Sequence, residues 1–101
     1  MALEDTPARA INPTAEEAYW RKAFRNEPYY KADLSYDDYS PAYRVGYTGP
    51  VRREGDFTSL EDVLRQDWQQ VRGQSRLSWT EARQATRAAW DRATESSSHP
   101  R

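Results

Sequence analysis

The chain contains no cysteine and almost no histidine, which removes most of the side chains that build metal sites and nucleophilic active sites. Among 101 residues there is no Cys, and the single histidine, His99, follows a run of serines. Disulfides, thiolate metal sites and thiol catalysis are therefore excluded. A histidine-based metal cluster or catalytic dyad is equally out of reach. We expect no enzymatic activity, no bound metal and no cofactor.

The chain also lacks long apolar runs, and its net charge is close to zero. Fifteen basic residues stand against sixteen acidic ones, so the formal net charge is -1. Such a balance gives no global attraction to nucleic acid or to an anionic membrane. No apolar run approaches the roughly 20 residues that span a bilayer. The opening residues, MALEDTPARAINP, carry acids where a signal peptide has bases. We expect a cytoplasmic protein without membrane contact.

Aromatic residues are what the chain has in excess. Hydrophobic residues make up 37% of it and charged residues 31%, with a mean hydropathy of -1.13. Four Trp, seven Tyr and two Phe are nevertheless atypical of a disordered sequence. Each of these side chains buries a large area, and Tyr and Trp keep a polar group for the surface. The composition predicts a polar globule with a small, aromatic-rich core.

Capping signals predict one helical domain at 12–95, between a flexible N-terminal arm at 1–11 and a disordered tail at 96–101. Asn12 or Thr14 is placed to cap a first helix, which Pro28 limits by restricting the residue before it. No segment shows the alternation of a strand. The predicted fold is an all-α, single-domain bundle of three to four helices, at about 13–26, 41–48, 59–72 and 79–95.

The segment between the first two helices is irregular and rich in tyrosine. Tyrosines recur there at helical spacing, but Pro41 lies among them, and a proline inside a helix costs about 3 kcal/mol. We therefore expect a short turn at 36–39, followed by a helix that Ser40 caps with Pro41 at its first position. The Gly49-Pro50 pair would stop this second helix.

The last two helices have the clearest signals. Thr58 or Ser59 is expected to cap the third helix, and Gly73 to end it. Ser78 and Glu81 form a capping box for the fourth helix. The predicted buried stripe of the third helix is Leu60, Val63, Leu64, Trp68 and Val71. The predicted stripe of the fourth is Trp79, Ala82, Thr86, Ala89, Trp90 and Ala93.

Taken together, four motifs resemble a family of small, uncharacterised bacterial helical proteins. They are a Y-W-R start, a D-Y-x-P-A-Y-R-x-G centre, an R-G-x-S-x-L-x-W turn and an A-x-R-x-A-W end, which this chain carries in that order between Tyr19 and Arg92. Members often have a tyrosine before the Gly-x-x-Phe segment, whereas this chain has VRREGDF. The resemblance implies a setting in bacterial stress adaptation and names no mechanism.

The tyrosines suggest an interaction surface. All seven fall between Tyr19 and Tyr47, close to several aspartates and an arginine. Tyr and Arg are enriched in the residues that dominate protein–protein binding. The alternative is that the tyrosines wrap the helices and direct their hydroxyls to solvent or backbone. The candidate residues for a protein partner or a second copy are Tyr29, Tyr30, Tyr36, Tyr39, Tyr43 and Arg44.

The segment 59–92 offers a second hypothesis, a helix-turn-helix that binds nucleic acid. Its last helix would present Arg83 and Arg87, with Arg76 in the turn. The turn at 73–77 is longer than the 3–4 residues usual in that motif. These arginines are also able to pair with nearby acids as ordinary surface ion pairs. We therefore keep nucleic-acid binding as the alternative.

No other constellation carries chemistry. Asp33, Asp37 and Asp38 lack the glycine and the closing glutamate of a calcium loop. The sequence has neither a phosphate-binding glycine loop nor the strained serine turn of hydrolases. The leading hypothesis is a small non-enzymatic protein that works by association with a protein partner or with itself, as an adapter, a regulator or a self-assembling unit.

Overall fold

The computed structural model describes residues 11–98, with side chains up to residue 95. Within that part of the chain there is no strand, and the predicted all-α fold is confirmed. The predicted arm lies outside the described residues except for Ile11, which packs against the core. The elements are α1 (Pro13–Ala23), the short 3-10 helix η2 (Phe24–Asn26), α2 (Tyr36–Arg52), α3 (Phe57–Val71) and α4 (Trp79–Ser98).

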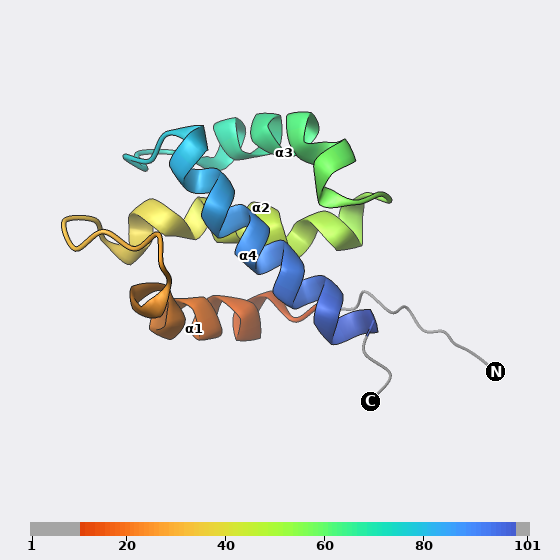
Figure 1. The fold of residues 1–101 in the computed structure, drawn as a ribbon, viewed down its shortest axis with the longest axis horizontal. Helices are drawn as coiled ribbons and strands as arrows, with labels where there is room; N and C mark the ends of the chain where they lie inside the picture. The colour runs from red at the N-terminus through yellow and green to blue at the C-terminus, as the bar shows by residue number, and fades with distance from the viewer. Residues whose placement is uncertain (1–10, 99–101) are drawn as a thin grey trace.

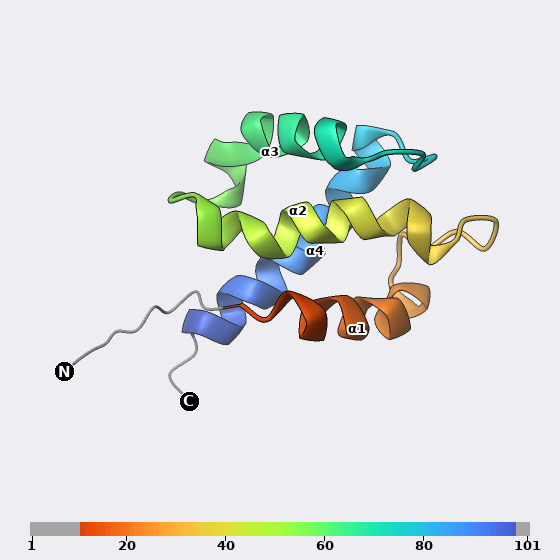
Figure 2. The same ribbon diagram turned by 180° about the vertical axis from the view of Figure 1, so that it is seen from behind.

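Helix α2 is the centre of the fold. In Figure 1, α4 crosses α2 diagonally, while α1 and α3 lie on opposite sides of it. Seen from behind, α2 lies in front of α4 with α1 and α3 beside it (Figure 2). One face of α2 is therefore left uncovered by the other helices. That face carries the exposed residues Asp37, Arg44 and Arg52.

The expected break in this central helix is wrong. Helix α2 runs without interruption from Tyr36 to Arg52, with Pro41 and Pro50 inside it. Ser35 begins it, since the Ser35 N–H donates to the Asp38 carboxylate at 3.0 Å. Three neighbouring helices bury about half of its side chains, and this burial outweighs the roughly 3 kcal/mol that a proline costs. The same burial carries the helix past the pair at 49–50.

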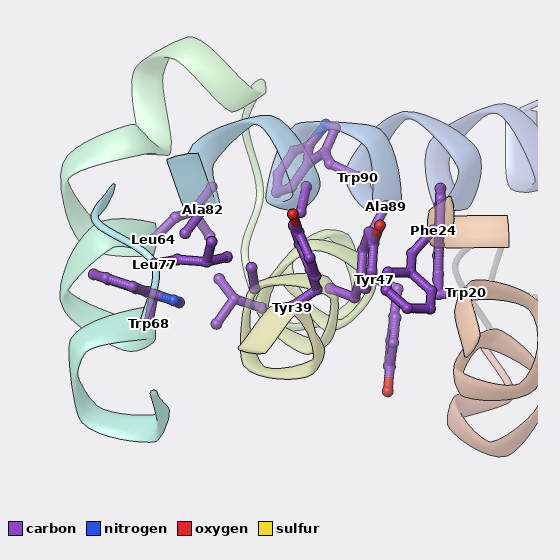
Figure 3. Close-up of a cluster of buried hydrophobic side chains, with 14 of the residues drawn as sticks. Trp20, Phe24, Tyr39, Tyr47, Leu64, Trp68, Leu77, Ala82, Ala89 and Trp90 are labelled. Carbon is purple, nitrogen blue, oxygen red and sulfur yellow. The ribbon is translucent and has the colours of Figure 1, made fainter. Parts of the chain in front are cut away.

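The core joins aromatic side chains from α1, η2, α2 and α3 to Trp90 and the small residues of α4. Figure 3 shows Tyr39 and Tyr47 of α2 between the aromatic residues of α1 and η2 and the apolar residues of α3. The α4 stripe is confirmed, with Trp79 only half-buried. In the α3 stripe, Val71 is 45% exposed, so its predicted place in the core is wrong. The labelled core residues include Trp20, Phe24, Leu64, Trp68, Ala82, Ala89 and Trp90.

Most helix ends follow the predicted caps. The Asn12 side chain accepts hydrogen bonds from the first amides of α1, and Ser78 and Glu81 make both bonds of their capping box. Gly73 has a φ of +54°, as a residue that ends a helix requires. Asp56, rather than Thr58 or Ser59, caps α3. Helix α4 continues through residues 96–98, three residues beyond its expected end.

Candidate protein-interaction surface

Three of the tyrosines proposed for partner binding belong to the core. Tyr36, Tyr39 and Tyr43 are 8%, 1% and 0% exposed. The Tyr43 ring stacks on Trp20 of α1 with centroids 4.5 Å apart. Their place on a contact surface is therefore a wrong expectation, because helical phase turns them toward α1 and α4 rather than toward water. These three tyrosines pack in the interior of the fold, as the alternative interpretation of the sequence expected.

Hydrogen bonds of tyrosine hydroxyl groups hold the segment between η2 and α2 in place. The hydroxyls of Tyr29 and Tyr43 lie 2.7 Å apart, and the Lys31 N–H donates to the Tyr39 hydroxyl at 3.0 Å. Burial raises the pKa of both members of the Tyr29–Tyr43 pair, so both phenols stay protonated. Tyr29 and Tyr30 are half-buried against the core. This cluster explains the tyrosine-rich sequence largely by folding.

Arg76, one of three arginines considered for nucleic acid, joins the α3–α4 turn to the start of α2. Its guanidinium lies 2.7 Å from the Asp38 carboxylate, which also accepts the Arg76 N–H at 3.0 Å. The Ser75 hydroxyl donates to the Asp38 carbonyl at 2.6 Å. The hydrogen bonds from Arg76 above all, together with that from the Ser35 N–H, lower the pKa of Asp38 to about 2. Arg76 therefore has a structural ion pair.

The other two arginines are paired as well. Arg83 bonds Glu61 of α3 and lowers the pKa of that carboxyl, and Arg87 bonds Asp91 on its own helix at 3.1 Å. Both guanidiniums lie over the Phe57 ring, at 5.4 and 5.0 Å from its centroid. The last helix therefore presents its arginines together with carboxylates, which weakens any phosphate-binding patch.

Arg44 is the proposed partner-binding residue that the structure leaves exposed on the open face of α2. It lines a groove between α2 and α3 with a volume of about 250 Å³. We call this the α2–α3 groove. The structure brings four residues of α2 and three of α3 together there: Arg44, Val45, Thr48, Arg52, Asp67, Gln70 and Val71.

The groove is basic. Its one acid, Asp67, is held by Arg53 through two nitrogen atoms, with contacts of 3.0 to 3.2 Å. Among residues 11–95, no ion pair joins Arg44 or Arg52 to a carboxylate. Two exposed guanidinium groups therefore remain along the groove with their charge unbalanced.

Apolar side chains lie beside these charges. A second hollow of about 580 Å³, formed by residues 50–55, shares Arg52 with the groove. Of the large hydrophobic side chains, Val51 in this hollow is 51% exposed and Val71 in the groove is 45% exposed. Arginine is enriched at protein–protein interfaces, so this hollowed region is the candidate for a protein-binding surface.

Sequence reasoning found Arg44 but missed the rest of the groove. Arg44, Thr48 and Arg52 follow one another at intervals of four, the spacing of a helix face. That signal was present, but the expected stop at 49–50 placed Arg52 outside the helix. The contribution of α3 had no signal, because Val71 fits the periodicity of a core stripe.

Within the described residues, no cluster of three or more His, Asp or Glu side chains is arranged to hold a metal ion. Over the same range, no helix has the length and apolar character needed to cross a membrane. No protein-family model, no curated protein and no solved structure matches this chain.

Proposed function

We propose that this protein acts by non-enzymatic association with a protein partner, and that the α2–α3 groove receives an acidic segment of that partner. The observation that carries the proposal is the pair of exposed arginines, Arg44 and Arg52, along a groove whose only acid is already bonded. Complementary charge steers association and selects partners. The exposed Val71 supplies apolar area beside the charges.

The size of the groove favours protein side chains over a small ligand. At about 250 Å³ it is below the roughly 300–1,000 Å³ of ordinary ligand pockets. The larger hollow at residues 50–55 is formed by the last turn of α2 and the connection that follows it, without a wall from a second helix. The two hollows share Arg52, but the larger one also contains the exposed Glu54, so we expect an acidic segment to follow the α2–α3 groove.

A second copy of this chain fits the groove less well than an acidic partner. In a two-fold contact along α2, each residue meets a residue of the symmetry mate. An axis at Thr48 would set Arg44 against the Arg52 of the mate, and an axis at Arg44 would set that residue against itself. Both arrangements bring like charges together. An axis midway between Asp37 and Arg44 would pair opposite charges, but it would centre the contact outside the groove, so the groove itself favours a partner of a different kind.

The resemblance to small bacterial proteins gives this association its setting. We expect an adapter or regulator that works in bacterial stress adaptation, in the cytoplasm. This expectation depends on the four sequence motifs between Tyr19 and Arg92.

The test compares two pairs of charge removals. A fluorescein-labelled, twelve-residue peptide rich in glutamate serves as the probe, with fluorescence anisotropy as the measurement. We expect Arg44→Gln with Arg52→Gln to weaken its binding at least fivefold. The matched control, Lys22→Gln with Arg25→Gln, removes the same charge from exposed positions on the α1–η2 side of the fold.

The control decides the outcome. Equal loss of binding in both double variants would mean that the peptide responds to total charge, and the groove would lose its assigned role. Chemical shift changes in an amide NMR spectrum should concentrate on residues 44–52 and 67–71. Changes spread evenly over α1 and α4 would also contradict the proposal.

A further inference from the structure

The shape of the groove says what kind of acidic segment fits it, if the proposed function is right. Its walls are two helices that lie beside each other, and the helix α4 crosses on the opposite face (Figure 2). The groove follows α2 from Arg44 to Arg52, a length of about 12 Å at 1.5 Å per residue. One recurring mode of recognition lays one face of an amphipathic helix into a groove of this kind.

The two arginines that have no ion pair with a carboxylate within residues 11–95 set a spacing for the occupant. Arg44 and Arg52 are eight residues apart, slightly more than two helical turns. On a helix that lies along α2, carboxylates seven or eight residues apart repeat the same distance. One carboxylate would then face each guanidinium, and charged hydrogen bonds of this kind are stronger than neutral ones.

The middle of the groove is apolar in character. The Thr48 hydroxyl donates to the Arg44 carbonyl at 2.6 Å, so its only proton is already used within α2. Val45 is buried in the groove, and Val71 and the amide of Gln70 are exposed on its α3 side. A polar group of the partner placed midway would find no free side-chain hydroxyl donor at Thr48. An apolar side chain between the two acids fits this surface best.

A third acidic residue on the partner helix, placed beyond Arg44, would be repelled by Asp37 of α2. Asp37 lies seven residues before Arg44, is exposed, and occupies the same face of α2. Asp37 therefore limits the positively charged part of this face of α2 to Arg44 and Arg52. Repulsive groups of this kind make a site selective, because they weaken partners that attraction alone would accept.

We propose that the occupant of the α2–α3 groove is an amphipathic helix of a partner protein with two carboxylates seven or eight residues apart on one face and an apolar side chain midway between them. The proposal rests on the proposed function and adds to it the conformation and the charge spacing of the partner segment.

Three synthetic peptides of matched length test this proposal by fluorescence anisotropy. The first carries two glutamates seven residues apart with a leucine midway on the same face. The second has the same composition, but one glutamate is moved to the opposite face. The third keeps the pattern and has proline at a central, solvent-facing position, which breaks the helix. We expect the first to bind at least fivefold tighter than the other two, and only to chains that retain Arg44 and Arg52.

The outcomes separate the two proposals. If all three peptides bind equally, and all lose binding in Arg44→Gln with Arg52→Gln, the helix and its spacing are refuted while the acidic groove stands. If binding is insensitive to that double variant, both proposals fail. Appending a glutamate that faces Asp37 should weaken the first peptide, and Asp37→Ser should restore its affinity.

Discussion

Gly46 of α2 lies directly against Thr86 of α4. A Cβ atom on Gly46 would collide with the Thr86 carbonyl oxygen and stand 2.7 Å from the Cβ of Ala89. One turn earlier, the Thr86 hydroxyl donates to the Ala42 carbonyl at 3.0 Å. Small residues at this crossing let the two backbones approach closely. This close crossing fixes which face of α2 is covered by α4.

Gly46→Ala should therefore destabilise the fold strongly. The added methyl group meets backbone, which cannot rotate away as a side chain can, so α2 and α4 must separate. We expect a loss of about 3 kcal/mol in the free energy of unfolding and a fall of roughly 10 °C or more in Tm. Thr48→Ala, on the exposed side of the same helix, should change the stability little, and thermal unfolding followed by circular dichroism measures both.

Asp38→Asn should lower the stability because it weakens the bond to Arg76 while keeping the shape of the side chain. Arg76 is 60% exposed, so water screens the pair, and we expect a loss of about 1 kcal/mol at neutral pH. Urea unfolding followed by tryptophan fluorescence gives the difference. Asp37→Asn, at the exposed neighbour, is the matched control. A similar loss in both variants would contradict the assigned role of Arg76.

The same pair predicts a pH dependence. The pKa of Asp38 is lowered from 3.8 to about 2 in the folded chain, so the folded state holds the proton less tightly than the unfolded state. Its contribution is complete above about pH 4 and is lost as the pH falls toward 2. The stability gap between the wild type and Asp38→Asn should therefore close over this interval. A gap that stays constant down to pH 2 would show that the carboxylate charge is not its cause.

Features that depend on neighbouring residues could be predicted from the sequence, whereas features that depend on distant helices could not. Asn12, Gly73 and the Ser78–Glu81 pair were predictable because a helix end is decided by residues within one turn. Pro41 misled the prediction because its local cost is offset by helices distant in the sequence. The groove was not predictable for the same reason, since Arg44 and Val71 meet only when α2 and α3 pack.

Tyr43 should behave as a core residue in mutation. Tyr43→Ser removes a side chain that is 0% exposed and is expected to cost about 3–5 kcal/mol, with loss of helical signal. Tyr43→Phe keeps the ring and breaks only the bond to Tyr29, at a cost of about 1 kcal/mol. Tyr19→Ser, at a side chain that is 41% exposed, is the control. An unchanged fold in Tyr43→Ser would return this residue to the surface hypothesis.

The groove arginines should be dispensable for folding. Arg44→Gln with Arg52→Gln removes two exposed side chains that have no ion pair within residues 11–95, so the free energy of unfolding should change by less than about 0.5 kcal/mol. Arg53→Gln breaks the contact with Asp67 and should cost about 1 kcal/mol. Chemical denaturation measures all three substitutions. A large loss in the double variant would mark these arginines as structural.

Nucleic acid should bind weakly, and not through the last helix. Arg83 and Arg87 each bond a carboxylate, so duplex DNA would have to displace Glu61 and Asp91 before it reached them. At 50 mM salt we expect no gel shift at micromolar protein. If a shift does appear, Arg83→Ala with Arg87→Ala should leave it unchanged.

The groove variant makes this test decisive. A shift that disappears in Arg44→Gln with Arg52→Gln would assign polyanion binding to the open face of α2, where the cations are unpaired. A shift that disappears only in the Arg83 and Arg87 variant, with a steep dependence on salt, would restore the helix-turn-helix hypothesis, because phosphate contacts release counterions. Because ion pairs already neutralise the outer face of α4, we expect any polyanion binding to follow the groove.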